Sequence, residues 1–258
     1  MNKNRLIKLV FILLYGVQVP VSAQYKKALT DADKASLEGI IVEKYYTYNS
    51  SDVMDTTGGC LPKGSVTYRI YVDMKPNYTL QAVYGVTDHL LSIKTTTHFY
   101  NNLSEGQGTG DKISDKRIIG STAAFDSWLT LGAATEYKYG VPKADDKDGS
   151  VLKIASMNAA DGMVAATIKP VTFFGINPNT VFNSANSSEF TTNNGSWAMF
   201  GGIKGATDDN KVLIAQVTTD GTLSFEINLQ IGTPTGGTVN YVAKNPQFDE
   251  IQYKALTY

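Results

Sequence analysis

The sequence has few of the residue types that most often carry catalysis or bind metals. Its 258 residues include one cysteine, Cys60, and two histidines, His89 and His98. One cysteine cannot form a disulfide within the chain, so an exported protein of this kind must be stabilised by its core. Cys60 lies in the turn-rich stretch TGGCLPKGS, which indicates a passive thiol, with a disulfide to a second chain as the alternative.

Recognisable catalytic and metal-binding patterns are also missing. The odd spacing of His89 and His98 would put them on opposite faces of a continuous strand, so a shared metal site or a serine triad is poorly supported. A surface or turn position is the better interpretation of each. No GxSxG, HExxH or P-loop pattern occurs. We therefore predict no catalytic residue, no metal and no cofactor. A non-enzyme is favoured, but the question stays open, because a pair of carboxylates from distant strands could still form a catalytic site.

The stretch ADDKDGS resembles half of a calcium-binding loop, because Asp146 and Asp148 precede a glycine. Alanine occupies the first ligand position, Ala144, and also the closing position, Ala155, where an EF-hand has glutamate. We expect an acidic surface turn here, with calcium binding as the alternative.

Long apolar runs are missing except near the start of the chain. Lys3, Arg5 and Lys8 precede the run LVFILLYGVQV, which ends at the small-residue site Val21-Ser22-Ala23. This run is shorter than the roughly 20 residues that span a membrane. Residues 1–23 are therefore predicted to be a signal peptide, cleaved before Gln24, with a retained anchor helix as the alternative.

Neither acidic nor basic residues are in large excess. Removing residues 1–23 takes away three basic and no acidic side chains, which changes the formal net charge from −1 to −4. A mildly acidic surface without a polybasic cluster gives no drive toward nucleic acid or an anionic membrane. We expect a secreted, cell-surface or periplasmic protein whose partner is a glycan or another surface protein.

Strand patterns fill most of the remaining chain, separated by clusters of Gly, Asn, Asp, Ser and Pro, without an amphipathic helix of ordinary length. This pattern predicts an all-β fold, an antiparallel β-sandwich of jelly-roll type, in one domain over residues 37–258 after a polar lead segment at 24–36 that holds one helical turn. The predicted strands are 37–48, 65–74, 78–84, 90–100, 127–133, 151–155, 162–169, 197–203, 211–218, 222–231, 238–242 and 250–258.

The stretch TYRIYVDMKPNYTLQAVYG predicts a hairpin. Side chains alternate along a strand, so one strand would turn Tyr68, Ile70, Val72 and Met74 to the core, leaving Tyr71 on the polar face. Pairing these with the apolar side chains of the returning strand requires an odd loop, which Lys75-Pro76-Asn77 supplies with Asn77 in the left-handed conformation. The apolar set of the returning strand is Tyr78, Leu80, Ala82 and Tyr84.

The stretch KVLIAQVTTDGTLSFEINLQI predicts a second hairpin. A three-residue loop ending at a left-handed Gly221 would set Leu213 opposite Ile227 and keep Gln216 off the core face. A two-residue turn would instead bury Gln216 unpaired, at a cost of about 1–3 kcal/mol. We therefore predict the three-residue loop, with Gly221 at positive φ and with every second residue from Leu223 to Ile231 in the core.

The two tryptophans raise the question of an exposed aromatic platform. Trp128 shares its strand face with Asp126 rather than with the neighbouring leucines, and Trp197 follows a polar loop that contains Asn194. A carbohydrate-binding site made of Trp128, Tyr71 or Trp197 and edged by Asp126 or Asn194 is one hypothesis. The alternative is that the rings fill the core, as large aromatic side chains do in most β proteins.

Three stretches carry a resemblance to a known class of module. LPKGSVTYRIYVDMKPNYTLQAVYG, FDSWLTLG and KVLIAQVTTDGTLSFEINLQIG resemble an uncharacterised β-rich module of secreted Bacteroidota proteins, often found in long multidomain surface proteins exported by the type IX pathway. The resemblance covers nearly all of the chain after residue 23. It implies export but transfers no functional residue, and this chain resembles a single module without an appended sorting domain.

These observations lead to three functional hypotheses. The first is a secreted or envelope-associated, non-enzymatic β-sandwich with an adhesive, structural or interaction role. The second is a carbohydrate-binding module. The third is a glycan hydrolase of sandwich fold, which requires two carboxylates facing each other in a cleft.

Overall fold

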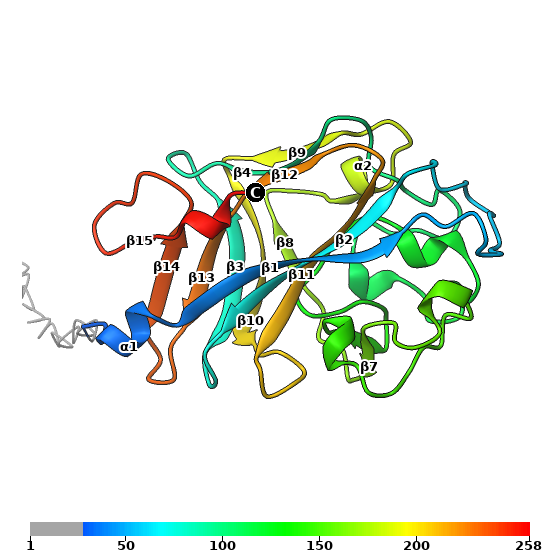
Figure 1. Cartoon of the computed structure of the whole chain (residues 1–258). Coiled ribbons are helices and arrows are strands. Elements are labelled where there is room, and N and C mark those ends of the chain that lie inside the picture. Colours follow the sequence, from blue (N-terminus) through cyan, green and yellow to red (C-terminus); the bar gives the residue numbers. More distant parts are fainter. Residues whose placement is uncertain (1–27) are drawn as a thin grey trace, which may run out of the picture.

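The computed structural model describes residues 28–258 and confirms the predicted all-β, antiparallel sandwich (Figure 1). The signal-peptide prediction lies outside the described residues. The expected single helical turn is α1 (Asp31–Lys34), which Thr30 and Asp33 cap reciprocally. A second helix, α2 (Asn179–Phe182), lies between strands. Short 3₁₀ helices span Gly110–Lys112, Thr122–Phe125, Lys143–Asp145, Ala155–Met157 and Lys254–Leu256.

One layer of the sandwich is a six-stranded sheet. Its neighbouring strands are antiparallel apart from the first pair, which is parallel. In spatial order the strands are β15 (Ile251–Gln252), β14 (Thr238–Val242), β13 (Asn228–Gly232), β3 (Thr79–Gly85), β10 (Gly195–Ile203) and β8 (Thr172–Phe174).

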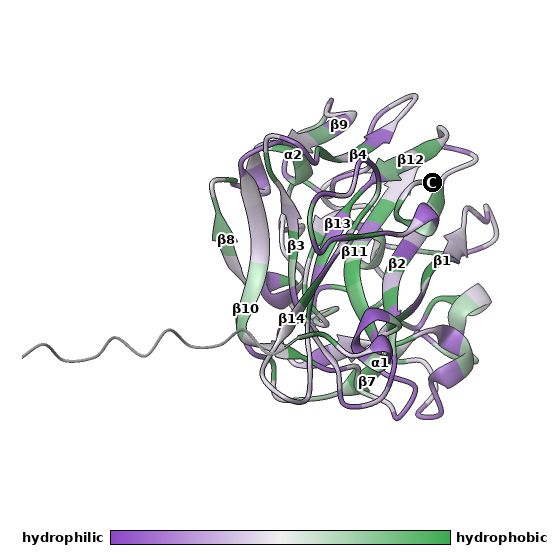
Figure 2. Ribbon diagram, turned by 90° about the vertical axis from the view of Figure 1, so that its left-hand side faces the viewer, coloured by the Kyte–Doolittle hydropathy of each residue, from purple (hydrophilic) through white to green (hydrophobic). Residues whose placement is uncertain are grey.

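The facing layer is a four-stranded antiparallel sheet, and Figure 2 shows β1 and β2 on the side of the molecule opposite β8 and β10. In spatial order its strands are β1 (Leu37–Thr47), β2 (Val66–Met74), β11 (Lys211–Thr219) and β5 (Trp128–Leu129).

Two smaller sheets complete the fold. The three-stranded sheet closes one end of the sandwich, at the top of Figure 1, and consists of β12 (Leu223–Glu226), β4 (Leu91–Thr95) and β9 (Glu189–Thr192). A two-stranded sheet pairs β6 (Lys138–Gly140) with β7 (Met163–Ala165).

The main core lies between the two large sheets. Ile70 and Val72 of the four-stranded sheet and Val83 and Trp197 of the six-stranded sheet all belong to one buried cluster. The alternate residues Leu223, Phe225, Ile227, Leu229 and Ile231 belong to it as well, as predicted.

A second core covers the other face of the four-stranded sheet, and this layer was not predicted. Its side chains come from β1, β2 and β11, from Leu61 between β1 and β2, and from residues 100–163, the green segment at the right of Figure 1. The prediction that Tyr71 stands on a polar, solvated face is therefore wrong. Tyr71 is fully buried here and donates to the carbonyl oxygen of Val141 at 2.8 Å.

The first predicted hairpin is wrong in its pairing, although its turn is right. Asn77 has a φ of 74°, as expected. However, β2 pairs with β1 and β11, whereas β3 pairs with β10 and β13. The turn therefore carries the chain from one layer of the sandwich to the other. An irregularity in β3 also turns Val83 to the core in place of Ala82 and Tyr84.

The second predicted hairpin is wrong for the same reason. After β11 the chain leaves the four-stranded sheet, and β12 pairs with β4. Gly221 does not have a positive φ. It is needed for space, because a Cβ atom there would lie 2.6–2.8 Å from the hydroxyl oxygens of Thr95, Thr96 and Thr97.

Some strand boundaries also differ from the prediction. The single strand expected over 222–231 is divided between β12 and β13, which belong to different sheets. The range 151–155 is irregular, and β6, β8 and β9 were not predicted. These are strands of three or four residues, too short to show a periodic pattern.

Candidate functional site

The structure does not bring the predicted platform residues together. Trp128 is 1% exposed and Tyr71 fully buried in the second core, while Trp197 is fully buried in the main core. Asp126 is also fully buried, and Asn194 is exposed at the turn between β9 and β10. These three rings cannot form an exposed stacking surface, because each is enclosed by other side chains.

Asp126, one of the two polar residues predicted at this site, has a structural role. The two carboxyl oxygens of Asp126 accept hydrogen bonds from the backbone N–H groups of Asn102 and Gln107, each at 2.8 Å. Burial raises the pKa of Asp126 well above its usual value, against the opposing effect of these hydrogen bonds. Asp126 thus holds the loop that follows residue 101 onto the second core.

The outer face of the six-stranded sheet is the best candidate for a functional surface. One row of register partners crosses it from strand to strand, and its side chains are small or polar without exception. The row consists of Thr172, Ala198, Ala82, Gln230 and Asn240. We call this surface, together with Gln81, Phe174 and Phe200 on the same side, the uncharged face.

The name reflects the composition of the whole sheet. None of its six strands contains Asp, Glu, Lys, Arg or His. The opposite sheet carries charged residues in three of its four strands, including Glu38, Lys44, Asp73 and Lys211. The lack of charge is therefore a property of one sheet of the fold.

Two phenylalanine rings project from the uncharged face. Phe200 is completely exposed and Phe174 is 57% exposed. The pairing of β10 with β3 is interrupted between Ala198 and Ile203, where Gly201 and Gly202 both have positive φ. Glycine adopts this conformation without strain, so a bulge forms that leaves Phe200 off the packed sheet.

A hollow of about 360 Å³ lies between these rings and the neighbouring polar side chains. Gln81, Gln230 and Thr172 line it together with Phe174 and Phe200. The amides have only long contacts with other side chains: Nε2 of Gln230 lies 3.4 Å from Oδ1 of Asn240, and the Thr238 hydroxyl lies 3.4 Å from Oε1 of Gln81. Most of their hydrogen-bonding capacity is therefore available to a ligand.

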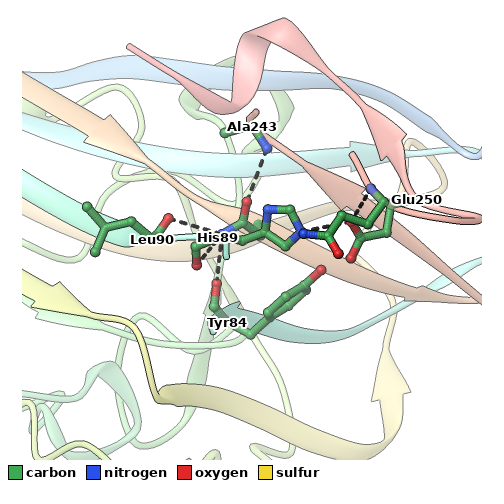
Figure 3. A network of polar contacts seen from close by, with 7 residues as sticks. Tyr84, His89, Leu90, Ala243 and Glu250 are labelled. Carbon is green, nitrogen blue, oxygen red and sulfur yellow. Dashed lines mark hydrogen bonds and ion pairs between the residues drawn. The ribbon is translucent and has the colours of Figure 1, made fainter. Parts of the chain in front are cut away.

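A polar network anchors the sheet beside this face (Figure 3). Nδ2 of Asn228 donates to the carbonyl oxygens of Tyr84, His89 and Leu90 at 3.1–3.3 Å, and its Oδ1 accepts from the backbone N–H of Ala243 at 3.1 Å. Asn228 thereby joins β13 to the end of β3 and to the segment after β14. The network therefore fixes one end of the central strands β13 and β3.

The histidine of this network was expected at the surface or in a turn. His89 does close a turn with Val86, but its ring is buried, with Nε2 2.8 Å from a carboxylate oxygen of Glu250. The Tyr84 hydroxyl is buried nearby without a hydrogen-bond partner. Burial, and to a smaller extent the charge of Glu250, raises the pKa of Tyr84.

A second hollow, of about 550 Å³, brings together two residues that the sequence analysis treated separately. Cys60 and His98 both line it, with Tyr100, Asn101 and Asp220. Cys60 is exposed and forms no disulfide within the described residues. Within residues 28–258 no hydrogen bond or ion pair joins Cys60 to His98.

The stretch ADDKDGS, which resembles half of a calcium-binding loop, also has a structural role. Asp146 is buried, contrary to the expected surface turn, and accepts hydrogen bonds from the backbone N–H groups of Asp148, Asp161 and Gly162 at 2.8–3.0 Å. In the described part of the chain, no group of three or more His, Cys, Asp or Glu side chains is arranged to hold a metal ion. Asp146 stabilises the loop through the backbone.

Sequence reasoning missed the uncharged face because its parts are spread over residues 79 to 252. A signal was present, since the strand-like stretches 79–85, 195–203, 228–232 and 238–242 all lack charged residues. Only the strand order joins them into one surface.

Comparisons of this chain with protein-family models, with curated proteins and with solved structures found no match.

Proposed function

We propose that this chain is a secreted or envelope-associated, non-enzymatic β-sandwich with an adhesive or interaction role, and that it acts through the uncharged face. The observation that carries the proposal is the exposure of Phe200 and Phe174 on a sheet face without any charged side chain. Burying a phenylalanine side chain contributes about 1.5–3 kcal/mol. Two such rings beside a hollow therefore offer a ligand a substantial gain on binding.

Export supports an extracellular or envelope role, and it rests on the predicted signal peptide and on the resemblance to secreted modules. The structure adds that no helix within residues 28–258 is long and apolar enough to cross a membrane.

The hydrolase hypothesis gains no support from the hollows described above. It requires two carboxylates on opposite sides of a cleft. A further hollow, beside α1, is lined by Asp249 and Glu250, but these are consecutive residues. Glu250 is moreover engaged by His89 and by the backbone N–H of Gln247.

The test is co-sedimentation of the purified protein, residues 24–258, with insoluble envelope fragments from a bacterium of the Bacteroidota. We expect the natural protein to sediment with the fragments and the double variant Phe174→Ser/Phe200→Ser to remain in the supernatant. Tyr137→Ser is the matched control, because Tyr137 is 63% exposed but lies outside the six-stranded sheet. Equal sedimentation of the natural protein and the double variant, or none of either, would contradict the proposal.

A further inference from the structure

We infer that the ligand of the uncharged face is a neutral polysaccharide whose chain lies across the strands. This inference rests on the proposed function, since it names the ligand class for the same surface. It depends on the charge, the hydrogen-bonding groups and the shape of the face.

The charge pattern selects an uncharged ligand. The six strands of the sheet carry no ionisable side chain other than tyrosine, although the chain after residue 23 has a formal net charge of −4. An anionic polymer would find no cation on the face, and a basic partner would find no carboxylate. A neutral ligand needs no counter-charge and loses no ion hydration on binding.

The hydrogen-bonding groups select a ligand rich in hydroxyls. Gln81, Gln230 and Asn240 present amide donors and acceptors beside one another, and Thr172 adds a hydroxyl. Sugar hydroxyls both donate and accept, so one ligand type can satisfy all of these groups. An apolar protein surface or a lipid bilayer would cover the same amides without replacing their bonds to water, which is unfavourable.

The shape selects an extended chain. The row from Thr172 to Asn240 crosses five neighbouring strands, a distance of about 19 Å at the usual spacing of strands. Ala198 and Ala82 are neighbours in this row, so no large side chain stands on the part of the row that crosses β10 and β3. Phe174 and Phe200 stand beside the hollow of about 360 Å³ and offer apolar ring faces on which sugar rings can stack.

The experiment measures depletion of the purified protein from solution by insoluble neutral polysaccharides: cellulose, β-1,3-glucan, xylan and mannan. Alginate gel is the anionic comparator, and phosphatidylcholine vesicles test the membrane alternative. We expect binding to at least one neutral polysaccharide that is insensitive to salt concentration, because no ion pair contributes.

Two variants test whether the face carries this binding. Phe200→Ala should weaken the apparent affinity about tenfold, the effect of losing one stacked ring. Gln230→Glu keeps the shape of the side chain but places a charge in the row, and it should weaken binding by a similar factor. Tyr137→Ala is the control and should bind like the natural protein, and the thermal unfolding midpoint of each variant shows whether it is folded.

Two groups of results would overturn the inference. The first is no depletion by any neutral polysaccharide, or equal binding by the natural protein and both variants. The second is preferential binding to alginate or to vesicles. If the protein sediments with envelope fragments through Phe174 and Phe200 but binds no neutral polysaccharide, the ligand class is wrong while the proposed interaction role stands. If it binds neither, both proposals fail.

Discussion

At the scale of single residues, buried polar side chains of the four-stranded sheet hydrogen-bond one another and the segment that carries Asp126. The Arg69 guanidinium stacks 3.6 Å from the ring centre of Tyr45 and donates to Oε1 of Gln216 at 2.9 Å. Gln216 in turn donates to the carbonyl oxygen of Asp126 at 2.7 Å. Burying Gln216 was expected to be unfavourable, but it is tolerated because its amide is fully hydrogen-bonded.

Asp126→Asn should destabilise the protein, because an amide can accept only one of the two backbone N–H groups that the carboxyl accepts. We expect a loss of about 1–3 kcal/mol in the free energy of unfolding near pH 4. Burial raises the pKa of Asp126, so its folded carboxyl holds a proton that the unfolded chain releases as the pH rises. The contribution of Asp126 to stability should therefore fall with rising pH, and the difference in stability between the natural protein and the variant should narrow.

Urea unfolding at several pH values measures this difference. Asp148→Asn, at an exposed carboxylate, is the control and should change stability by no more than about 0.5 kcal/mol. If Asp126→Asn were as stable as Asp148→Asn at acidic pH, Asp126 would not hold the loop that follows residue 101.

At the scale of elements, the alternating pattern identified strands more reliably than it identified their partners. The pattern of β2 is the same whether β2 pairs with β3 or faces it across the core, because either arrangement turns Ile70 and Val72 inward. Pairing depends on interactions with distant strands such as β11. For this reason the turn residue Asn77 was predicted correctly while the hairpin was not.

The turn between β2 and β3 allows a local test. Asn77 has a φ of 74° and only a long 3.4 Å contact to Lys204. Asn77→Gly should leave stability nearly unchanged, whereas Asn77→Val should cost about 1–2 kcal/mol, because a β-branched residue is strained in this conformation. Thermal unfolding of the two variants side by side provides the measurement, and equal midpoints would contradict the assigned backbone geometry.

At the scale of the whole molecule, the two large sheets differ in what covers them. The four-stranded sheet has apolar side chains on both faces, the main core on one and the second core on the other. The outer face of the six-stranded sheet has small, amide and hydroxyl side chains and the exposed rings of Phe174 and Phe200. This difference leaves one broad sheet face open to a ligand.

The buried tyrosines predict unfolding at alkaline pH. Burial raises the pKa of Tyr46 and Tyr100 to about 12, and it also raises the pKa of Tyr45 and Tyr71. In the unfolded chain these hydroxyls ionise near pH 10. Below that pH both the folded and the unfolded chain keep the proton, so these tyrosines contribute a constant amount to the free energy of unfolding. Above it the unfolded chain loses the proton more readily, which lowers the free energy of unfolding.

We therefore expect the free energy of unfolding to fall between about pH 10 and pH 12, by at most about 1.4 kcal/mol per pH unit for a tyrosine such as Tyr100. Tyr100→Phe removes one titrating group, as well as the hydrogen bond to the Gly59 carbonyl oxygen. The variant should be less stable at neutral pH but show a shallower fall above pH 10 in urea unfolding. Parallel curves for the two proteins would rule out Tyr100 as a contributor.

Local sequence patterns were enough to predict the all-β class, most long strands, the helical turn at α1 and the left-handed Asn77. Period-two burial and turn chemistry act between near neighbours, so the sequence carries them directly. The sequence also contained the uncharged stretches that line the candidate site. Three features depend instead on contacts between remote segments. These are the pairing of the strands, the burial of Tyr71 and Trp128 by residues 100–163, and the assembly of four distant uncharged stretches into one surface. The free energy of such contacts comes from packing the whole chain, and no local pattern records it.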